Sequence, residues 1–181
     1  MAEPPERLTL ETERLVLEPV SPAHAEGLYA AIAASQAELL PWMPWAREPS
    51  LAAAIVMTQR TPREWLEDHE FHFALVDKAT RLVLGIVGLN REQSRQAELH
   101  YWIRTDHAGK GLTTEAAGAV VSWARQALGL KRITLWAGRD NQASRRVAEK
   151  LGFKHLGPLD WRPEGGEGHF DAESYELSLS P

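Results

Sequence analysis

The sequence predicts a mixed α/β (α+β) fold, and three observations on the order of its segments predict it. Helical patterns dominate the chain from Ser21 to about residue 70. Two strands joined by a turn follow, and from residue 98 onward the pattern alternates strand, helix, strand, helix, strand. Early helices, a strand meander and then this alternation are typical of a mixed sheet covered by helices. No repeat or linker divides the 181 residues, so one domain over 1–181 is expected.

The first elements are defined by proline and capping residues. Residues 1–9 are expected to be a flexible leader, followed by a strand over 15–20 that ends near Pro19. Ser21 and Pro22 have the residue types of an N-cap and a first helical position, which predicts a helix running to about Glu38.

A segment rich in proline and tryptophan separates this helix from the next. Residues 39–45 contain Trp42, Met43 and Trp45 between two prolines, so a regular helix interior is excluded there. A second helical stretch is expected to begin near Ser50. The segment 61–64, Thr-Pro-Arg-Glu, combines a capping box with a proline in the first turn and predicts another helix starting at Pro62.

The later elements follow from the change between strand and helix periodicity and from glycines that stop each helix. They are expected as strands 71–76 and 82–89, a turn at 77–80, strand 98–103, helix 113–128, strand 132–137, helix 141–151, strand 153–156, a hairpin loop at 163–168 and strand 174–179.

Composition excludes several classes of function. The absence of cysteine removes disulfides, thiolate catalysis and cysteine-based zinc sites. A formal net charge of −5 gives no general attraction to nucleic acid. No signal peptide or run of about 18 apolar residues is present, so the expected location is cytoplasmic, without a membrane partner. The seven histidines show no metal-ligand spacing, and no metal is expected.

The loop between strand 98–103 and the next helix has the composition of an anion site. Gly109 and Gly111 flank Lys110, and they allow a sharp turn that brings several backbone N–H groups to one side. The first N–H groups of the following helix lack intrahelical partners, and the helix dipole makes that end positive. A pyrophosphate would suit this end, although glycine spacing alone fits an ordinary strand-to-helix loop equally well.

Two ordered motifs resemble those of the GNAT acetyltransferase superfamily. Residues 101–116, with Gly109-Lys110-Gly111-Leu112-Thr113-Thr114-Glu115, are similar to its motif A. Asn141-Gln142-Ala143-Ser144, leading to Leu151-Gly152-Phe153, is similar to its motif B. With the Pro/Trp segment 39–45 upstream, the nearest subgroup is the RimJ/RimL type, which acetylates protein N-termini. The resemblance implies a GNAT fold, with a mostly antiparallel sheet of six to seven strands flanked by about four helices, and a possible homodimer.

The resemblance also implies acetyl-CoA as co-substrate. Strand residues 101–104 would pair with pantetheine, and loop N–H groups from 108 to 114 would hold the pyrophosphate. The implied cofactor-binding residues are Trp102, Ile103, Arg104, Ala108, Gly109, Lys110, Gly111, Leu112, Thr113, Thr114, Asn141 and Ser144. Ala108 and Thr113 depart from the family pattern of Gln or Arg first and Gly or Ala last, and the bulk of Thr113 is expected to alter affinity.

The chemistry needs a proton donor for the departing thiolate and a proton acceptor for the amine. The resemblance assigns Ser144 to the thiolate, and Asn141 to capping the helix, orienting the cofactor, or both. Glu98 and His100 lie two apart on one strand and so on one face. Glu98 is the expected base, with a surface ion pair as its alternative, and His100 is a base or a packed histidine. Leu156 stands where relatives can carry a glutamate.

The remaining predictions leave alternatives open. Basic residues near the motifs would meet cofactor phosphates or lie in solvent: Lys110, Arg139, Arg145 and Arg146. Trp42, Met43 and Trp45 would wall the acceptor groove or pack in the core. The expected activity is acetyl transfer to a primary amine, in particular a protein N-terminus. A small-molecule amine acceptor or a non-catalytic acyl-CoA sensor are the alternatives, because one fold serves many acceptors.

Overall fold

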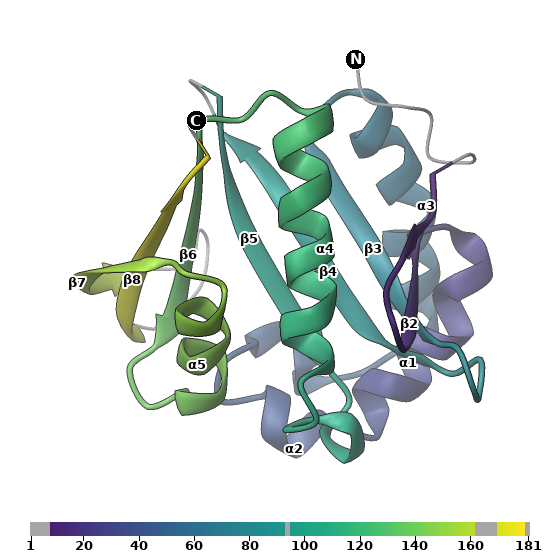
Figure 1. Cartoon of the computed structure of the whole chain (residues 1–181). Helices are drawn as coiled ribbons and strands as arrows, with labels where there is room; N and C mark the ends of the chain where they lie inside the picture. The colour runs from purple at the N-terminus through teal and green to yellow at the C-terminus, as the bar shows by residue number, and fades with distance from the viewer. Residues whose placement is uncertain (1–7, 93–94, 162–169, 180–181) are drawn as a thin grey trace.

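One sheet of eight strands runs through the protein, whose computed structural model describes residues 8–92, 95–161 and 170–179. The strand order is β1-β2-β3-β4-β5-β6-β8-β7 (Figure 1). Neighbours pair antiparallel except β5 and β6, which are parallel. The strands are β1 (Leu10–Glu11), β2 (Leu15–Pro19), β3 (Glu70–Asp77), β4 (Val83–Glu92), β5 (Gln96–Ile103), β6 (Arg132–Gly138), β7 (Lys154–Trp161) and β8 (Phe170–Ser178).

Helices cover both faces of this sheet. Helices α4 and α5 lie on one face and α1 and α2 on the other, with α3 behind the β3 side (Figure 1). The helices are α1 (Ala25–Ala33), α2 (Gln36–Leu39), α3 (Leu51–Leu66), α4 (Leu112–Ala127) and α5 (Gln142–Lys150). Short 3-10 turns occur at Pro22–His24, Pro44–Arg47 and Thr105–His107. Among the described residues, no helix has both the length and the apolar character that crossing a bilayer requires.

Side chains of β5 alternate between two hydrophobic cores. Leu99, Tyr101 and Ile103 face the core under α4, which also contains Val120 of that helix. Trp102 belongs to the second core, together with Leu28 and Ala31 of α1. Because successive strand residues point to opposite faces, Glu98 and His100 share the α1 face with Trp102.

The mixed α/β fold and most expected elements are confirmed, with a small difference in number. Within the described ranges, the sheet has eight strands rather than six or seven, and there are five α-helices rather than about four. The extra strand is β1, whose two residues pair with β2, and the extra helix is the single turn α2. Neither has enough periodic residues to stand out in the sequence. The expected hairpin loop at 163–168 and leader residues 1–7 lie outside the described residues, whereas Leu8 packs against the α4 core.

The helix expected from Ser21 to Glu38 is interrupted at Ser35. This residue is fully buried, and its hydroxyl accepts the backbone N–H of Thr105 at 3.0 Å. The chain therefore leaves α1 after Ala33 and restarts as α2. The break coincides with a contact to a residue 70 positions away, and no local pattern contains that information.

The prediction of a separate helix starting at Pro62 is wrong, because α3 is continuous from Leu51 to Leu66. The hydroxyl of Thr61 donates to the Met57 carbonyl at 2.9 Å instead of capping a new helix. Ser50 is the true cap, and its hydroxyl accepts the N–H of Ala53 at 3.1 Å. The helix therefore passes through proline, at the loss of one backbone hydrogen bond.

The two parallel strands at the centre of the sheet diverge. They pair only at Gln96–Arg132, Ala97–Ile133 and Glu98–Thr134. Beyond this point β5 still pairs with β4 to Ile103, and β6 still pairs with β8 to Gly138. A V-shaped opening therefore separates the two strands on the side where α4 and α5 begin (Figure 1). We call this feature the strand opening.

Candidate active site

The loop before α4 presents a row of backbone N–H groups without partners. Gly109 and Gly111 have φ angles of 74° and 81°, which a side chain rarely allows, and Gly111 is the N-cap of α4. The first helical hydrogen bond runs from the Glu115 N–H to the Gly111 carbonyl at 3.0 Å. From 109 to 114, no backbone N–H donates to any acceptor in the described part of the chain. A helix start with six free backbone N–H donors has the physical properties of an anion-binding site.

The loop is open to its surroundings at Gly109. A Cβ built on Gly109 would meet no atom within 4 Å, so the loop is open to a ligand there. The strand opening lies beside it and offers the unpaired backbone edge of β5 beyond Glu98. Free N–H donors in the loop and an unpaired edge of β5 are the kinds of group that a pyrophosphate and an amide-containing arm, as in acetyl-CoA, would bind.

Most side chains of the loop bind the loop itself. The Lys110 ammonium donates to the Asp106 carbonyl at 2.8 Å, and the Arg104 guanidinium holds the Asp106 carboxylate at 3.0 and 2.9 Å. These hydrogen bonds from Arg104 and from His107 hold the pKa of Asp106 well below its usual range. Ala108 is exposed and Thr113 half-buried. Ligand contacts at this loop would therefore come mainly from the backbone, which stays a prediction.

Ser144 lies at the strand opening because α5 begins directly after β6. Asn141 caps this helix, and its side chain accepts the Ser144 N–H at 3.1 Å. The phenol of Tyr101 on β5 lies 3.1 Å from the Ser144 hydroxyl and donates to the Ser144 carbonyl at 3.0 Å. Burial raises the pKa of Tyr101 to about 12, so the phenol keeps its proton at neutral pH. The Ser144 hydroxyl is thus held by a group that can donate or accept.

Glu98 stands at the last residue pair before the strands diverge. Its carboxylate accepts the indole N–H of Trp136 at 3.0 Å, and the side chain is half-buried. Burial raises the pKa of Glu98, and the Trp136 hydrogen bond opposes that rise. A carboxylate with a raised pKa is a better proton acceptor than an ordinary one. The alternative of an exposed surface ion pair does not describe Glu98, whose described partner is an indole.

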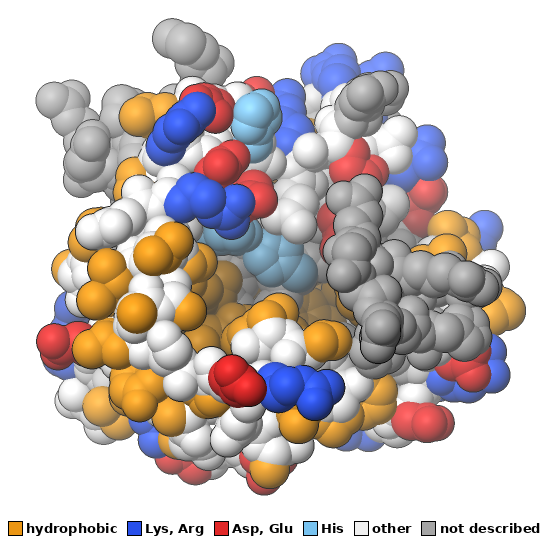
Figure 2. Space-filling view, turned by 180° about the vertical axis from the view of Figure 1, so that it is seen from behind, with side chains coloured by type: hydrophobic (Ala, Val, Ile, Leu, Met, Phe, Trp, Pro, Cys, Tyr) orange, Lys and Arg blue, Asp and Glu red, His pale blue; other side chains and the backbone are white. Residues whose placement is uncertain are grey.

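Two histidines meet on the same face as Glu98. His72 of β3 and His100 of β5 lie on either side of Gly88 of β4, with their Nε2 atoms 3.0 Å apart. Burial, reinforced by His72, lowers the pKa of His100 to about 3, so the imidazole is neutral. Figure 2 shows histidine side chains in a hollow on this face, with hydrophobic side chains along its lower rim. His100 is therefore both packed against a histidine and placed on the face that has the hollow.

The Pro/Trp segment packs against β6 and β5. A Cβ on Gly138 of β6 would lie 2.5 Å from the Trp42 ring, so that ring rests directly on the β6 backbone. Trp45 makes an edge contact with Trp102, with ring centroids 5.9 Å apart, and Met43 packs against the α1 core. The contacts of this segment show that its residues pack against the sheet and the α1 core, and a role as the wall of an acceptor groove stays a prediction.

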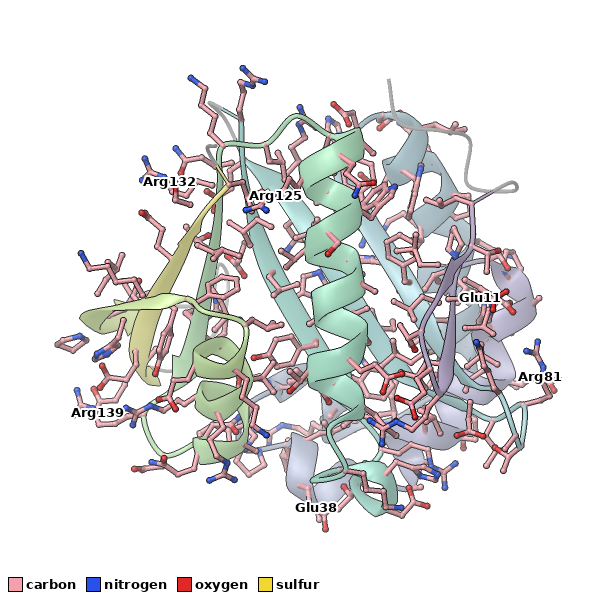
Figure 3. All side chains as sticks on the ribbon, viewed as in Figure 1. Glu11, Glu38, Arg81, Arg125, Arg132 and Arg139 are labelled. Atoms are coloured by element: carbon pink, nitrogen blue, oxygen red, sulfur yellow. The ribbon has the colours of Figure 1, made fainter. Side chains whose placement is uncertain are left out.

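Of the four basic residues near the motifs, three are occupied by partners within the protein. Lys110 binds its own loop, as described above. Arg139, labelled in Figure 3, pairs with Glu173 at 3.2 Å, and Arg145 donates to the Tyr175 hydroxyl at 2.9 Å. Arg146 is exposed and makes no hydrogen bond or ion pair within the described residues. It is the basic side chain of this set with most freedom to meet a ligand.

Several contacts of the site were missed from the sequence. Tyr101, Trp136 and His72 contact Ser144, Glu98 and His100 respectively. Strand alternation predicts which face of the sheet Trp136 and His72 occupy. Knowing which strands are neighbours would then have predicted their contacts with Glu98 and His100. The order of the eight strands was the missing information, because neither spacing nor composition specifies which strand lies beside which.

A family model described as an acetyltransferase (GNAT) domain matches residues 14–154 of the chain. This range includes the loop before α4, the strand opening, Ser144 and Glu98. It ends at the first residue of β7, so β8 lies beyond it.

Individual proteins agree with the family model. An uncharacterised N-acetyltransferase of Bacillus subtilis, YoaA, is 31% identical over 83% of this chain and 85% of its own length. The ribosomal-protein-serine acetyltransferase of Escherichia coli is 26% identical over 78% of this chain and 80% of its own. The structure of the microcin C7 self-immunity acetyltransferase MccE, in complex with acetyl-CoA and AMP, superposes with a TM-score of 0.84 at 19% identity. That superposition covers 92% of this chain and 93% of the other.

Proposed function

This chain belongs to the GNAT acetyltransferase family, and from this premise we propose that it acetylates the α-amine of a protein N-terminus. Acetyl-CoA is the co-substrate. The observation that supports the proposed donor site is the strand opening beside a loop whose N–H groups, from 109 to 114, lack partners. The acceptor class is supported by the 26% identity to an enzyme named for ribosomal-protein serine acetylation.

The loop and β5 hold the donor in this proposal. Backbone N–H groups of Gly109–Thr114 bind the pyrophosphate, aided by the positive end of the α4 dipole. The backbone of 101–104 pairs with the pantetheine amides along the strand opening. The bound acetyl-CoA supplies an activated thioester, so no nucleophile of the protein is needed, which agrees with a sequence without cysteine.

Ser144 delivers a proton to the departing thiolate. Its hydroxyl reaches the strand opening from α5 and is held by the Tyr101 phenol at 3.1 Å. When the Ser144 proton moves to sulfur, the Tyr101 phenol turns its hydrogen bond from the Ser144 carbonyl to the serine oxygen, and a proton from solvent later restores the serine hydroxyl. Tyr101 therefore positions Ser144, and its hydrogen bond stabilises the negative charge that forms on the serine oxygen.

Glu98 accepts the proton of the amine, directly or through water. A protein α-amine has a pKa of about 8 and is partly neutral at physiological pH, so a carboxylate of raised pKa is sufficient as base. A lysine side chain, with a pKa of about 10.4, would need a stronger base. This difference favours an α-amine over a lysine as acceptor.

A small cationic amine is the second candidate acceptor. Glu98 is a half-buried carboxylate on the face that has the hollow, and the protein carries a net charge of −5. Both features attract a cation.

We further propose that residues 1–181 work as one domain. Strand β8 lies beyond the family match but pairs along the length of β6, from Arg132 to Gly138. The β6 side of the strand opening would lose its support without it.

Release of free thiol from acetyl-CoA tests the proposal. The acceptors are a peptide with a free α-amine and one internal lysine, the same peptide with its α-amine blocked, and small polyamines. Thiol release with the free peptide alone supports the N-terminal acceptor. Release with the blocked peptide, or with polyamines only, contradicts it. Binding of acetyl-CoA without release on any amine identifies a sensor instead.

A further inference from the structure

The turn between β1 and β2 contacts the loop of residues 108–111 and the start of α4, which we call the donor loop because they are proposed to hold acetyl-CoA. The Arg14 guanidinium contacts the Glu115 carboxylate through Nε at 2.8 Å and Nη2 at 2.7 Å. The Arg14 backbone N–H donates to the other oxygen of the same carboxylate at 2.8 Å. Its remaining nitrogen, Nη1, donates to the carbonyl of Lys110 at 2.8 Å. One side chain from the start of the chain thus binds both the loop and the first turn of α4.

The contact with Lys110 determines the direction of a neighbouring N–H. The carbonyl of Lys110 and the N–H of Gly111 belong to one planar trans peptide, so they point in opposite directions. Because Arg14 holds that carbonyl, the Gly111 N–H must face away from Arg14. Gly111 has a positive φ of 81° and open surroundings, since a Cβ there would come no closer than 3.5 Å, to Arg14 itself. Within the described residues, no other hydrogen bond to the Lys110 carbonyl or from the Gly111 N–H restrains this peptide.

The contact with Glu115 determines the charge at the helix start. A carboxylate in the first turn would compete with an anionic ligand for the same N–H groups. Burial alone would raise the pKa of Glu115, but hydrogen bonds from Thr12 and Arg14 outweigh it and lower that pKa. Glu115 is therefore ionised, and Arg14 supplies the compensating positive charge.

We propose that Arg14 is a positioning residue for acetyl-CoA, which orients the Lys110–Gly111 peptide toward the pyrophosphate and neutralises Glu115. This inference rests on the proposed assignment of residues 108–114 to the pyrophosphate. A purely structural role would be to tie β2 to α4, without any effect on the donor. The two roles differ in one measurable respect, because only the first depends on the pyrophosphate of the donor.

Donors with and without a pyrophosphate separate these roles. We would compare acetyl-CoA with S-acetylpantetheine, which has the same thioester and amide arm but no nucleotide. The variants are Arg14→Gln, and Arg14→Lys, which keeps the charge but cannot contact Glu115 and the Lys110 carbonyl together. The control is Arg132→Gln (Figure 3), which removes an exposed pair of 3.0 Å between Arg132 of β6 and Glu176 of β8. Arg132 and Arg14 have similar side-chain exposure, 47% and 43%.

The expected result is a selective loss. Arg14→Gln should weaken CoA binding, measured by calorimetry, about ten- to hundredfold, as expected for loss of charged hydrogen bonds. Arg14→Lys should lose less, and Arg132→Gln should match wild type. The kcat/KM for S-acetylpantetheine should stay within about twofold of wild type in all three variants.

Two results would overturn the inference. One is unchanged CoA affinity in both Arg14 variants. The other is a loss of kcat/KM that is equal for acetyl-CoA and S-acetylpantetheine, which indicates a structural role only. If Arg14→Gln fails to fold, Arg14→Lys alone decides between these outcomes. Failure of the wild-type protein to bind CoA would reject the proposed function itself, and is thus a distinct result.

Discussion

His72 and His100 lie on strands that are not neighbours, yet their Nε2 atoms are 3.0 Å apart. The strand between them places Gly88 opposite both residues. A Cβ at Gly88 would lie 2.4 Å from a carbon of the His72 ring and 2.8 Å from the Nε2 atom of His100. The missing side chain of Gly88 therefore makes the contact between the imidazoles possible.

The first prediction is that Gly88→Ala destabilises the protein by about 1–3 kcal/mol, the typical cost of overpacking a filled site. Urea unfolding measures this change. Gly118→Ala is the matched control, because its Cβ would meet only Leu151, at 3.4 Å, and a helical alanine is favoured over glycine. Equal stability of the two variants would show that the histidines can separate without cost.

The second prediction concerns stability on acidification. The folded pKa of His100, about 3, lies below the ordinary value of 6.5, so the unfolded chain binds a proton first as the pH falls. Stability from this residue is complete above pH 6.5 and declines progressively down to about pH 3. His100→Gln should therefore flatten the dependence of unfolding free energy on pH in the range 5–6.5, relative to wild type. Parallel curves for the two proteins would contradict this assignment.

The third prediction is a pH–rate shift controlled by Trp136. The Trp136 hydrogen bond lowers the pKa of Glu98 against the effect of burial, so Trp136→Phe should move the acidic limb of kcat/KM to higher pH. Glu98→Gln should abolish that limb and slow transfer about a hundredfold. An acidic limb that is unmoved in both variants would assign the amine proton to another group or to water.

The fourth prediction separates chemistry from donor binding at Ser144. Ser144→Ala should lower kcat about tenfold or more and change the CoA dissociation constant by less than about twofold. Tyr101→Phe keeps the serine but removes its hydrogen-bond partner, so a smaller loss of kcat is expected. Turnover equal to wild type in Ser144→Ala would remove this residue from the mechanism.

Local patterns were sufficient for the elements whose limits are set by neighbouring residues. The glycines after α4 and α5, Gly129 and Gly152, have φ angles of 58° and 80° and end these helices as predicted. The limits of α1 and α2 coincide instead with a distant contact, the hydrogen bond that Ser35 accepts from Thr105. The capping pattern is present before Pro62, but α3 continues through it, and the Thr61 hydroxyl donates to the Met57 carbonyl within the helix instead of capping a new one.

The donor loop was more predictable than the residues around it for the same reason. Its glycines, its free N–H groups and the helix that follows occupy consecutive positions from 108 to 115. Arg14 contacts Glu115 across 101 residues, and Trp136 contacts Glu98 across 38. Such pairs follow from strand order and from the close approach of the β1–β2 turn to α4. Neither can be obtained from spacing in a single sequence.

The strand opening has a consequence for how distant substitutions act. Five strands lie on one side of the β5–β6 junction and three on the other, and three residue pairs join them within the sheet. The two parts of the sheet are therefore paired over a short length, and we expect the angle between them to set the width of the strand opening, where acetyl-CoA is proposed to bind. Substitutions that repack the outer strands β7 and β8 would rotate the three-stranded part of the sheet relative to the five-stranded part. Donor affinity would then change through geometry, although no contacting residue had been altered.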